Sequence, residues 1–384
     1  MIAAASRPPE QRGLARDGVR LLVATPDGGR HARFAELALF LSAGDLLVVN
    51  TSATVAAAVD GHRADGRPVT VHVSSPLPDG TWLIELRQGP ASTGRVTDAA
   101  AGEEIFLPAG GSLALVRRYP DADSDRMWVA SATAGGGLGG FRGYLDRHGR
   151  PIRYSYVPQA WPLAAYQTVF ARSPGSAEMP SAGRPFTDRL VTELVAAGVV
   201  ITPVTLHAGV ASLEAGEPPL PERFTVPAPT AELVNLTRSA GRRVIAVGTT
   251  VTRALESAAD PAGTVRARRG WTDLVLGADH PARVVTGLIT GWHDPEASHL
   301  ALLEAVAGPN LVRGAYQAAE QAGYLWHEFG DSCLLLPDSP ALAWPGLGPA
   351  RYAVPAAAPA GLVPVHPLAA GYPAGYPAGH AARH

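Results

Sequence analysis

The sequence predicts an α/β domain with a mainly parallel sheet, interrupted by an inserted antiparallel β-barrel domain. Helix and strand patterns alternate after residue 160, which is typical of a mainly parallel sheet. Before that point, short segments such as VTVHVSS and TWLIELR are separated by Gly, Pro and Asp turns and show no helical periodicity, which indicates a small barrel. We therefore expect a discontinuous α/β domain at residues 1–55 and 156–337, with the barrel at residues 56–155.

The first buried strand of the α/β domain is expected within LALFLSAGDLLVVNT (37–51), where a turn precedes a strand that ends in Asn50 and Thr51. The segment FTDRLVTELVAAG (186–198) has a polar start, leucines at helical spacing and a final glycine, so it predicts a helix. The strand VVITPVTLHAG follows and reaches His207.

Three further segments continue the alternation. A helix is expected near 230–240, and RRVIAVGTTVTRALESA (242–258) predicts a strand, a tight turn and a helix. VVTGLITGWH (284–293) predicts another strand, and ASHLALLEAVAG (297–308) another helix. Residues 338–384 are rich in Pro, Gly and Ala and lack apolar density, so we expect a disordered tail there.

Composition limits the possible functions. The 384 residues carry a net charge of −2, which gives no overall attraction to nucleic acid, and all basic side chains other than histidine are arginine. Without lysine, the chain has no Schiff-base lysine and no P-loop lysine. The single cysteine, Cys333, excludes an internal disulfide. No membrane span or signal peptide is predicted, so we expect a cytoplasmic protein.

Polar residues follow the expected parallel strands where each one ends. They are Asn50 and Thr51, His207, Gly248-Thr249-Thr250, and His293. Because ligands bind at the carboxyl edge of such sheets, we expect these residues to line one cleft. The alternative is that each strand end simply reaches the surface with an ordinary polar residue.

The turn at Gly248 to Thr250 is the most informative of these ends. Amides at the start of a helix can hold carboxylates or phosphates. The alternative is that the threonine hydroxyls only cap the helix. Arg253 and Glu256 lie three residues apart on one helical face and either face a ligand or pair with each other. The histidines lack metal-ligand spacing, so we expect no metal site.

Eight segments, collinear from residue 10 to 336, resemble a known family, the S-adenosylmethionine:tRNA ribosyltransferase-isomerases of queuosine biosynthesis. The opening PPE and ARDGVRLLV is similar to that of the family. The other seven segments are AGDLLVVNTSA (family GDLLVxNDTR), AYQTVFA (RYQTVYA), EMPSAGRPFT (AAPTAGLHFT), VTLHAGVAS (VTLHVGxGTF), AVGTTVTRALES, LITGWHDPEASHL (LITNFHLPxSTL) and EFGDSCLLL (SYGDAMLI).

The resemblance implies an α/β domain with an inserted barrel, and it implies a reaction. The family transfers and isomerises the ribosyl part of S-adenosylmethionine onto 7-aminomethyl-7-deazaguanine in tRNA. The products are epoxyqueuosine in tRNA, adenine and methionine. The reaction requires a base, which removes a proton beside the sulfonium, and an acid, which assists the departure of adenine. S-adenosylmethionine is a co-substrate, and no metal or other cofactor is expected.

The matching positions are the predicted site residues. Two alternatives remain: Asp331 caps a turn, and His207 is a satisfied core histidine. We expect His207, Glu256, His293 and Asp331 in catalytic roles, and Asn50, Thr51, Gln167, Thr168, Ser181, Gly183, Gly248, Thr249, Thr250 and Arg253 in substrate binding.

Several positions depart from the family segments. Ser52 and Ala53 replace an aspartate and an arginine, and Arg184-Pro185 replaces Leu-His. The family block H-x-M-H-x-E is represented by PPLPERFTV, which keeps only Glu222, and Gly291 replaces an asparagine. Two alternatives therefore stand beside the tRNA enzyme: a paralog that uses S-adenosylmethionine on a small molecule, and an inactive binding paralog. The segment VRARRGW (265–271) is the densest arginine cluster for tRNA, or else a solvated loop. The sequence does not indicate an oligomeric state.

Overall fold

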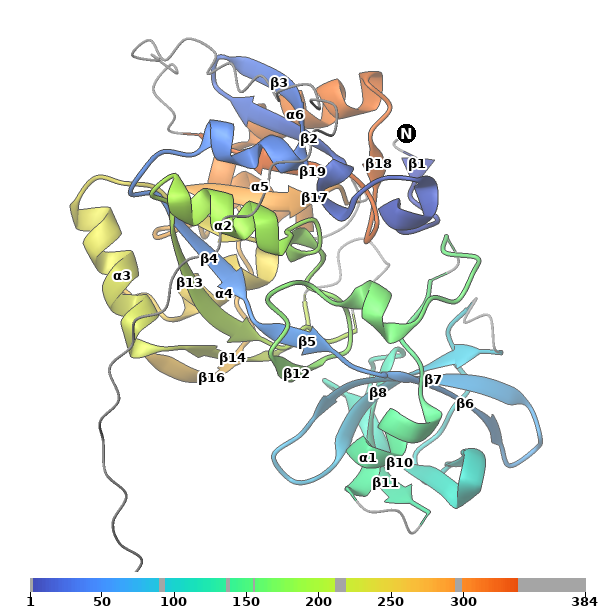
Figure 1. Ribbon diagram of the computed structural model, residues 1–384. Helices are drawn as coiled ribbons and strands as arrows, with labels where there is room; N and C mark the ends of the chain where they lie inside the picture. Colours follow the sequence, from blue (N-terminus) through green and yellow to red (C-terminus); the bar gives the residue numbers. More distant parts are fainter. Residues whose placement is uncertain are drawn as a thin grey trace, which may run out of the picture. The chain divides into compact units, whose positions relative to one another are not determined.

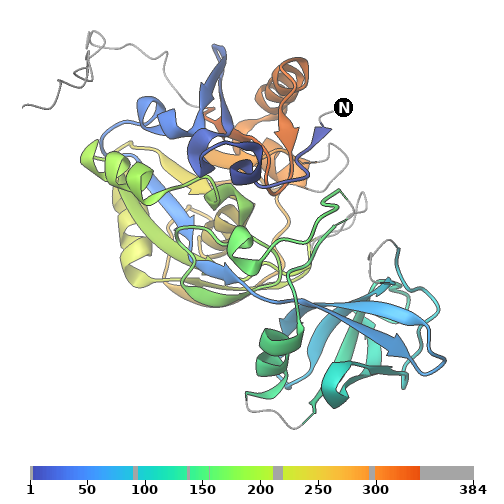
Figure 2. The ribbon, with the colours of Figure 1, turned by 45° about the vertical axis from the view of Figure 1, so that its right-hand side comes forward.

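The structure is a computed structural model. It describes residues 3–89, 94–135, 139–154, 156–210, 219–293 and 299–337. Two assemblies of strands dominate it, a nine-stranded sheet and a closed six-stranded barrel (Figures 1 and 2). The predicted fold class, an α/β domain with an inserted antiparallel barrel, is confirmed. The predicted tail, residues 338–384, lies outside the described residues.

The nine-stranded sheet has the order β16-β14-β13-β4-β15-β17-β19-β2-β3. At its centre β13, β4, β15 and β17 are parallel neighbours, while β14, β16, β19 and β3 join through antiparallel pairs. The strand bounds are β2 (Arg20–Thr25), β3 (Gly28–Arg33), β4 (Leu46–Asn50), β13 (Val200–Leu206), β14 (Glu222–Val226), β15 (Val244–Val247), β16 (Arg268–Thr272), β17 (Gly287–Gly291) and β19 (Ser332–Leu335).

Both faces of the central strands of this sheet are buried. Along β4, Leu46 and Val48 contact the core on one face, whereas Leu47 and Val49 contact the core on the other. The first face is covered by α3 (Ala228–Ser239), α4 (Thr249–Ser257), α5 (His299–Ala307) and α6 (Pro309–Gln321). The second is covered by α2 (Asp188–Ala196) and the 3-10 helix Phe34–Phe40 (Figure 1). Because helices cover both faces, successive side chains of the central strands are apolar on both faces.

The helix starts agree with the expected signals. Thr187 precedes α2, and its hydroxyl accepts a hydrogen bond from the amide of Leu190 at 3.2 Å. Helix α4 begins at Thr249 directly after Gly248, which has φ of 98° and therefore a conformation that favours glycine. The predicted helices near 230–240 and 297–308 correspond to α3 and α5.

The barrel closes in the order β10-β11-β8-β7-β6-β9. Its strands are β6 (Ala58–Arg63), β7 (Pro68–Pro76), β8 (Trp82–Gln88), β9 (Glu104–Phe106), β10 (Gly111–Tyr119) and β11 (Met127–Ala134), and α1 (Gly140–His148) follows them. Inward side chains, including Val71, Ile84 and Trp128, form a core of their own. The predicted boundaries at 56 and 155 enclose all six strands but stay predictions.

Two short strands mark the passage between the α/β domain and the barrel. The strand β5 (Ser52–Thr54) continues from β4 toward the barrel, and β12 (Ser173–Ser176) runs parallel to it on the return (Figure 1). A second small pair joins β1 (Ala3–Ala4) to β18 (Leu325–Trp326). None of the described helices is long and apolar enough to cross a membrane.

Candidate functional site

The carboxyl ends of β13, β4, β15 and β17 lie next to one another in the sheet, as the sequence predicted. Asn50 connects three of the segments that meet there. Its amide nitrogen donates to the carbonyl of Leu206 at 2.8 Å and to Thr250 Oγ1 at 3.2 Å. Its amide oxygen accepts from the main-chain nitrogens of Ser52 at 3.0 Å and Leu206 at 3.1 Å. Asn50 therefore fixes the ends of β4 and β13 against the start of α4.

Thr51 continues this connection between β4 and β13. Its Oγ1 donates to the carbonyl of Val204 at 3.1 Å and lies 2.8 Å from Thr205 Oγ1. These bonds engage the hydroxyl within the protein while the residue stays half-exposed. The predicted role of Thr51 in substrate binding is not tested by these contacts and stays a prediction.

His207 is held by a chain of hydroxyl groups. Its Nδ1 lies 2.8 Å from Ser52 Oγ, which lies 2.6 Å from Ser176 Oγ on β12. Burial, together with the positive charge of Arg223, lowers the pKa of His207 to about 4, so the ring is neutral at pH 7. A side chain at Gly175 would collide with the ring, because the backbone of β12 passes directly against it. His207 is therefore positioned tightly, in its neutral form.

The start of α4 lies at the centre of this edge. Gly248 donates its amide to the carbonyl of Ile289 at 2.8 Å, and a side chain there would approach Ala182 to 3.3 Å. Thr249 and Thr250 are half-exposed, and no side chain caps the helix. The first amides of a helix have no intrahelical partner, so this end has the chemistry to receive an anionic group.

Arg253 and Glu256 both lie on α4, and the structure gives each of them protein partners. Arg253 is buried, forms an ion pair with Glu222 and donates to the carbonyls of Leu274 at 3.1 Å and Thr272 at 3.2 Å. Burial raises the pKa of Glu222, and its carboxylate also accepts from the amide of Gly209 at 3.0 Å. The pair thus holds β14 and the turn after β13 against α4.

Glu256 points to a different segment, a loop that precedes β17. It accepts from three consecutive amides, those of Arg283, Val284 and Val285, at 2.9, 2.9 and 3.0 Å. The suggested alternative, a pair between Arg253 and Glu256, is therefore wrong. Three backbone donors give Glu256 a structural role, and its predicted catalytic role has no support from this geometry.

The segment from Gln167 to Gly183 packs across the same edge. The Gln167 side chain exchanges two hydrogen bonds with the main chain of Thr54, at 2.8 and 3.1 Å. Thr168 is buried, and its Oγ1 has no hydrogen-bond partner in the described part of the chain. Gly183 lies against Thr168, since a Cβ there would be 3.4 Å from its methyl group. Ser181 opens the 3-10 helix Ser181–Gly183.

His293 and Asp331 lie beyond β15 as seen from β4, next to the strands β17 and β19. His293 follows β17, and its Nε2 is 3.4 Å from Thr290 Oγ1. Asp331 is buried, forms an ion pair with Arg20 at 2.8 Å, and accepts from the main-chain amides of Arg20 and Leu325, each at 2.8 Å. Asp331 thus ties β2 to the turn before β19, which agrees with the alternative of a structural turn residue.

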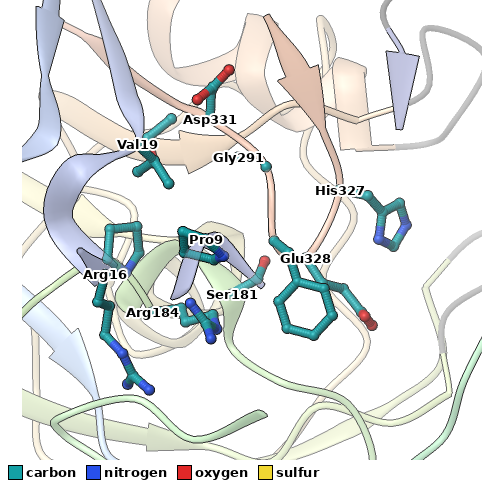
Figure 3. Close-up of a pocket in the computed structure, with 13 residues that line it drawn as sticks. Pro9, Arg16, Val19, Ser181, Arg184, Gly291, His327, Glu328 and Asp331 are labelled. Carbon is teal, nitrogen blue, oxygen red and sulfur yellow. The ribbon is translucent and has the colours of Figure 1, made fainter. Parts of the chain in front are cut away.

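A small pocket opens beside Asp331 and Ser181. Figure 3 shows both of these residues at its wall, together with Gly291, Arg184 and Glu328. Ser181 and Asp331 were predicted from the sequence, and Gly291 was noted only as a departure from the family segment. The structure therefore brings the segment around residue 181 to the ends of β17 and β19.

Sequence reasoning missed Glu178, His327 and Glu328. Burial, together with the negative charge of Glu178, raises the pKa of Glu328 to about 8. Tyr154 donates its hydroxyl to Glu178, and the Tyr156 hydroxyl lies 2.7 Å from His327 Nδ1. A signal was present: carboxylates stand at 178 and 328 where the quoted family segments have alanine and serine.

Comparisons with known proteins agree with these observations. The profile of a family described as "Queuosine biosynthesis protein" matches residues 2–335. A relative from Acidiphilium cryptum, named S-adenosylmethionine:tRNA ribosyltransferase-isomerase, is 34% identical over 83% of this chain and 93% of its own length. A relative of the same name from Anaeromyxobacter dehalogenans is 36% identical over 84% of this chain and 93% of its own length.

A solved structure is also similar. It is the crystal structure of S-adenosylmethionine tRNA ribosyltransferase from Thermotoga maritima, which is 25% identical to this chain. The match covers 87% of this chain and 96% of the other, with a TM-score of 0.46.

Proposed function

Because this chain belongs to the queuosine biosynthesis protein family, we propose that it is an S-adenosylmethionine:tRNA ribosyltransferase-isomerase. It transfers and isomerises the ribosyl moiety of S-adenosylmethionine onto 7-aminomethyl-7-deazaguanine in tRNA, and the products are epoxyqueuosine in tRNA, adenine and methionine. The observation that carries this proposal is the family match over residues 2–335. Relatives of that name align over more than nine tenths of their own length, which supports a whole enzyme rather than a shared module.

The edge of the sheet at Asn50, His207 and Thr249 is the proposed binding site for S-adenosylmethionine. The uncapped amides at the start of α4 suit its carboxylate, because the helix dipole favours an anion there. Asn50 supports this turn by its hydrogen bond to Thr250. Gln167, Thr168, Ser181 and Gly183 complete the wall by packing across the strand ends.

His207 and His293 are the proposed acid–base residues. His207 is neutral at pH 7 because its pKa is about 4, so its ring can hydrogen-bond to a substrate without adding charge. Its Nδ1 is engaged with Ser52, which leaves Nε2 as the atom available for a proton. The base beside the sulfonium and the acid for adenine need no metal or redox cofactor in this scheme.

The acceptor surface proposed for tRNA is the edge strand β16. Arg268 and Arg269 are exposed there, and Trp271 keeps 36% of its surface accessible. Arginines neutralise phosphates, and an exposed indole stacks on an unpaired base. Because the proposed substrate is tRNA, we also propose that the enzyme acts in the cytoplasm.

Release of adenine is the test of the proposed reaction. The protein is incubated with S-adenosylmethionine and either tRNA bearing 7-aminomethyl-7-deazaguanine or the same tRNA bearing guanine, and adenine is quantified by chromatography. Adenine that forms only with the first tRNA supports the proposal. If adenine forms without tRNA, the small-molecule paralog replaces this proposal. If no adenine forms under any condition, the inactive binding paralog replaces it.

One observation favours the small-molecule alternative. The family histidine of the GLHF segment corresponds to Pro185, and the adjacent Arg184 is buried and paired with Glu10 at 3.0 Å. An imidazole is thereby replaced by a ring without a proton to transfer, which changes the chemistry available next to Ser181. The same assay, run with and without tRNA, separates the two functions.

A further inference from the structure

The turn between β18 and β19 holds two acid–base side chains in a fixed conformation. His327 has φ of 77°, a left-handed conformation that residues other than glycine rarely adopt. Its amide donates to the carbonyl of Trp292 at 3.0 Å, and the amide of Gly330 donates to the carbonyl of His327 at 2.8 Å. Such backbone conformations persist where surrounding contacts enforce them, and they cluster at functional sites.

Glu328 projects from the same turn. Figure 3 shows the side chains of His327 and Glu328 extending away from Ser181 and Arg184. Oε2 of Glu328 is buried and has no hydrogen-bond partner within the described residues. A buried carboxyl oxygen without a donor is costly, so this atom marks a place for a missing hydrogen-bond donor.

A second carboxylate lies close to it. Glu178 accepts a hydrogen bond from the buried Tyr154 hydroxyl, and its negative charge acts on Glu328. Because burial and this charge raise the pKa of Glu328 to about 8, Glu328 keeps its proton at pH 7. Glu328 is therefore uncharged at pH 7 when no cation is bound.

Two tyrosine rings, those of Tyr154 and Tyr156, lie near these carboxyl groups. Tyr154 and Tyr156 are stacked with centroids 5.8 Å apart, and Tyr156 lies 4.1 Å from the His327 ring. The faces of such rings attract cations. The guanidinium of Arg184 lies over Phe329 at 5.0 Å, on the other side of the turn. Its charge is paired with that of Glu10.

We propose that Glu178 and Glu328, with the rings of Tyr154 and Tyr156, bind a primary ammonium group of a substrate, the aminomethyl group of the acceptor base. This inference rests on the proposed function, which supplies an acceptor with that group. The ammonium donates to Glu328 Oε2, and Glu328 releases its proton to solvent as the cation binds.

The aminomethyl base, which is the acceptor of the proposed reaction, fits this site better than S-adenosylmethionine, which is the donor. The amino group of S-adenosylmethionine has a carboxylate on the same carbon, which two carboxylates would repel. The aminomethyl group has no neighbouring anion and sits on a flat, aromatic base. Glu178 and Glu328 stand where the family segments quoted above have alanine and serine, so the residues that we assign to this ammonium group differ from those at the same positions of the quoted segments.

Calorimetric titration of the full chain with two free bases tests the site without turnover. One base is 7-aminomethyl-7-deazaguanine, and the other is 7-methyl-7-deazaguanine, which lacks only the amine. We expect the wild type to prefer the aminomethyl base at least about tenfold, since a charge-assisted hydrogen bond is formed in a buried place. Comparing phosphate with Tris buffer at pH 7 measures the release of about one proton.

Glu328→Gln and Glu178→Gln should each reduce the preference for the amine at least about fivefold, and Glu328→Gln should abolish proton release. Glu104→Gln, an exposed carboxylate of β9, is the matched control and should change neither quantity. Circular dichroism monitors folding. Should Glu328→Gln fail to fold, Glu178→Gln and Tyr154→Phe, which removes the donor to Glu178, decide the result.

Equal affinity for the two bases, an unchanged preference in the variants, or no binding of either base at millimolar concentration would overturn the ammonium site. Failure of the proposed function gives another result. Adenine release would then be absent with the tRNA, while the preference for the amine and its loss in Glu328→Gln would remain.

Discussion

Asn50, the last residue of β4, donates a hydrogen bond from its side-chain amide to Thr250 Oγ1 at 3.2 Å, across 200 positions of the sequence. The same amide group holds Leu206 at the end of β13. The start of α4 is thereby fixed relative to two neighbouring strands. The proposed pocket for S-adenosylmethionine thus depends on one buried side chain.

Asn50→Ala should lower the free energy of unfolding by roughly 2–3 kcal/mol, because several buried partners lose their hydrogen bonds. Urea unfolding followed by tryptophan fluorescence measures this. Asn310→Ala, on the exposed first turn of α6, should change it by less than about 0.5 kcal/mol. Equal stability of the two variants would contradict the role given to Asn50.

Gly175→Ala should displace the His207 ring, since the new methyl group would occupy its position. We expect a loss of roughly 1–3 kcal/mol of stability and a changed imidazole signal of His207 in NMR spectra. Gly314→Ala is the control, because a methyl group on that helical glycine of α6 meets no atom within 4 Å. An unchanged His207 signal in Gly175→Ala would show that the backbone of β12 does not position the ring.

Thr249→Val should weaken binding of S-adenosylmethionine about three- to tenfold, because the hydroxyl at the start of α4 is lost while the size of the side chain is kept. Isothermal titration calorimetry gives both dissociation constants. Thr192→Val, on the exposed face of α2, is the matched control. Unchanged affinity in Thr249→Val would place the ligand elsewhere.

The raised pKa of Glu328 predicts the direction in which the stability of the protein changes with pH. Its pKa is raised to about 8, so between its ordinary pKa and pH 8 the folded state holds a proton that the unfolded state has lost. Stability contributed at this position must therefore fall as the pH rises through that window. Relative to Glu328→Gln, the wild type should lose roughly 1–3 kcal/mol between pH 5 and pH 8.5 in urea unfolding. Parallel stability curves for the two proteins would contradict a raised pKa of Glu328.

Arg268→Ala combined with Arg269→Ala should weaken tRNA binding about tenfold and reduce its dependence on salt, because fewer phosphates are neutralised. Filter binding at several salt concentrations measures both. Arg30→Ala with Arg313→Ala, two exposed arginines on β3 and α6, is the control of equal charge change. A similar loss in both double variants would indicate only the effect of net charge.

The central strands β4, β13, β15 and β17 of the α/β domain, and its helices α2 to α5, were predictable because their signals are local. Buried runs such as LLVVN, the polar Thr187 before α2 and the Gly248 turn before α4 each carry their structure within a few residues. The strands β2, β3, β14, β16 and β19 and the helix α6 were not predicted. Strands β3 and β16 are mostly exposed, so their sequences lack a buried pattern. Strands β14 and β19 contain buried residues but are only five and four residues long, which is too short for a clear period.

The roles of the side chains were harder to predict, because partners come from distant segments. Asp331 and Glu256 were expected in catalysis, yet Asp331 holds Arg20 and Glu256 holds the amides of residues 283–285. A carboxylate in the sequence gives no sign of whether its partner is a substrate or the protein.

The sequence by itself determined the fold class, the family and the neighbouring strand ends at Asn50, His207 and Gly248, because periodicity and motif order are properties of the linear chain. Only the tertiary structure decided which charges are neutralised. Arg253 pairs with Glu222, and the charge of Glu178, which accepts a hydrogen bond from Tyr154, acts on Glu328, 150 positions away in the sequence. Burial and charge proximity set these pKa values and pairings, and neither quantity exists until the chain has folded.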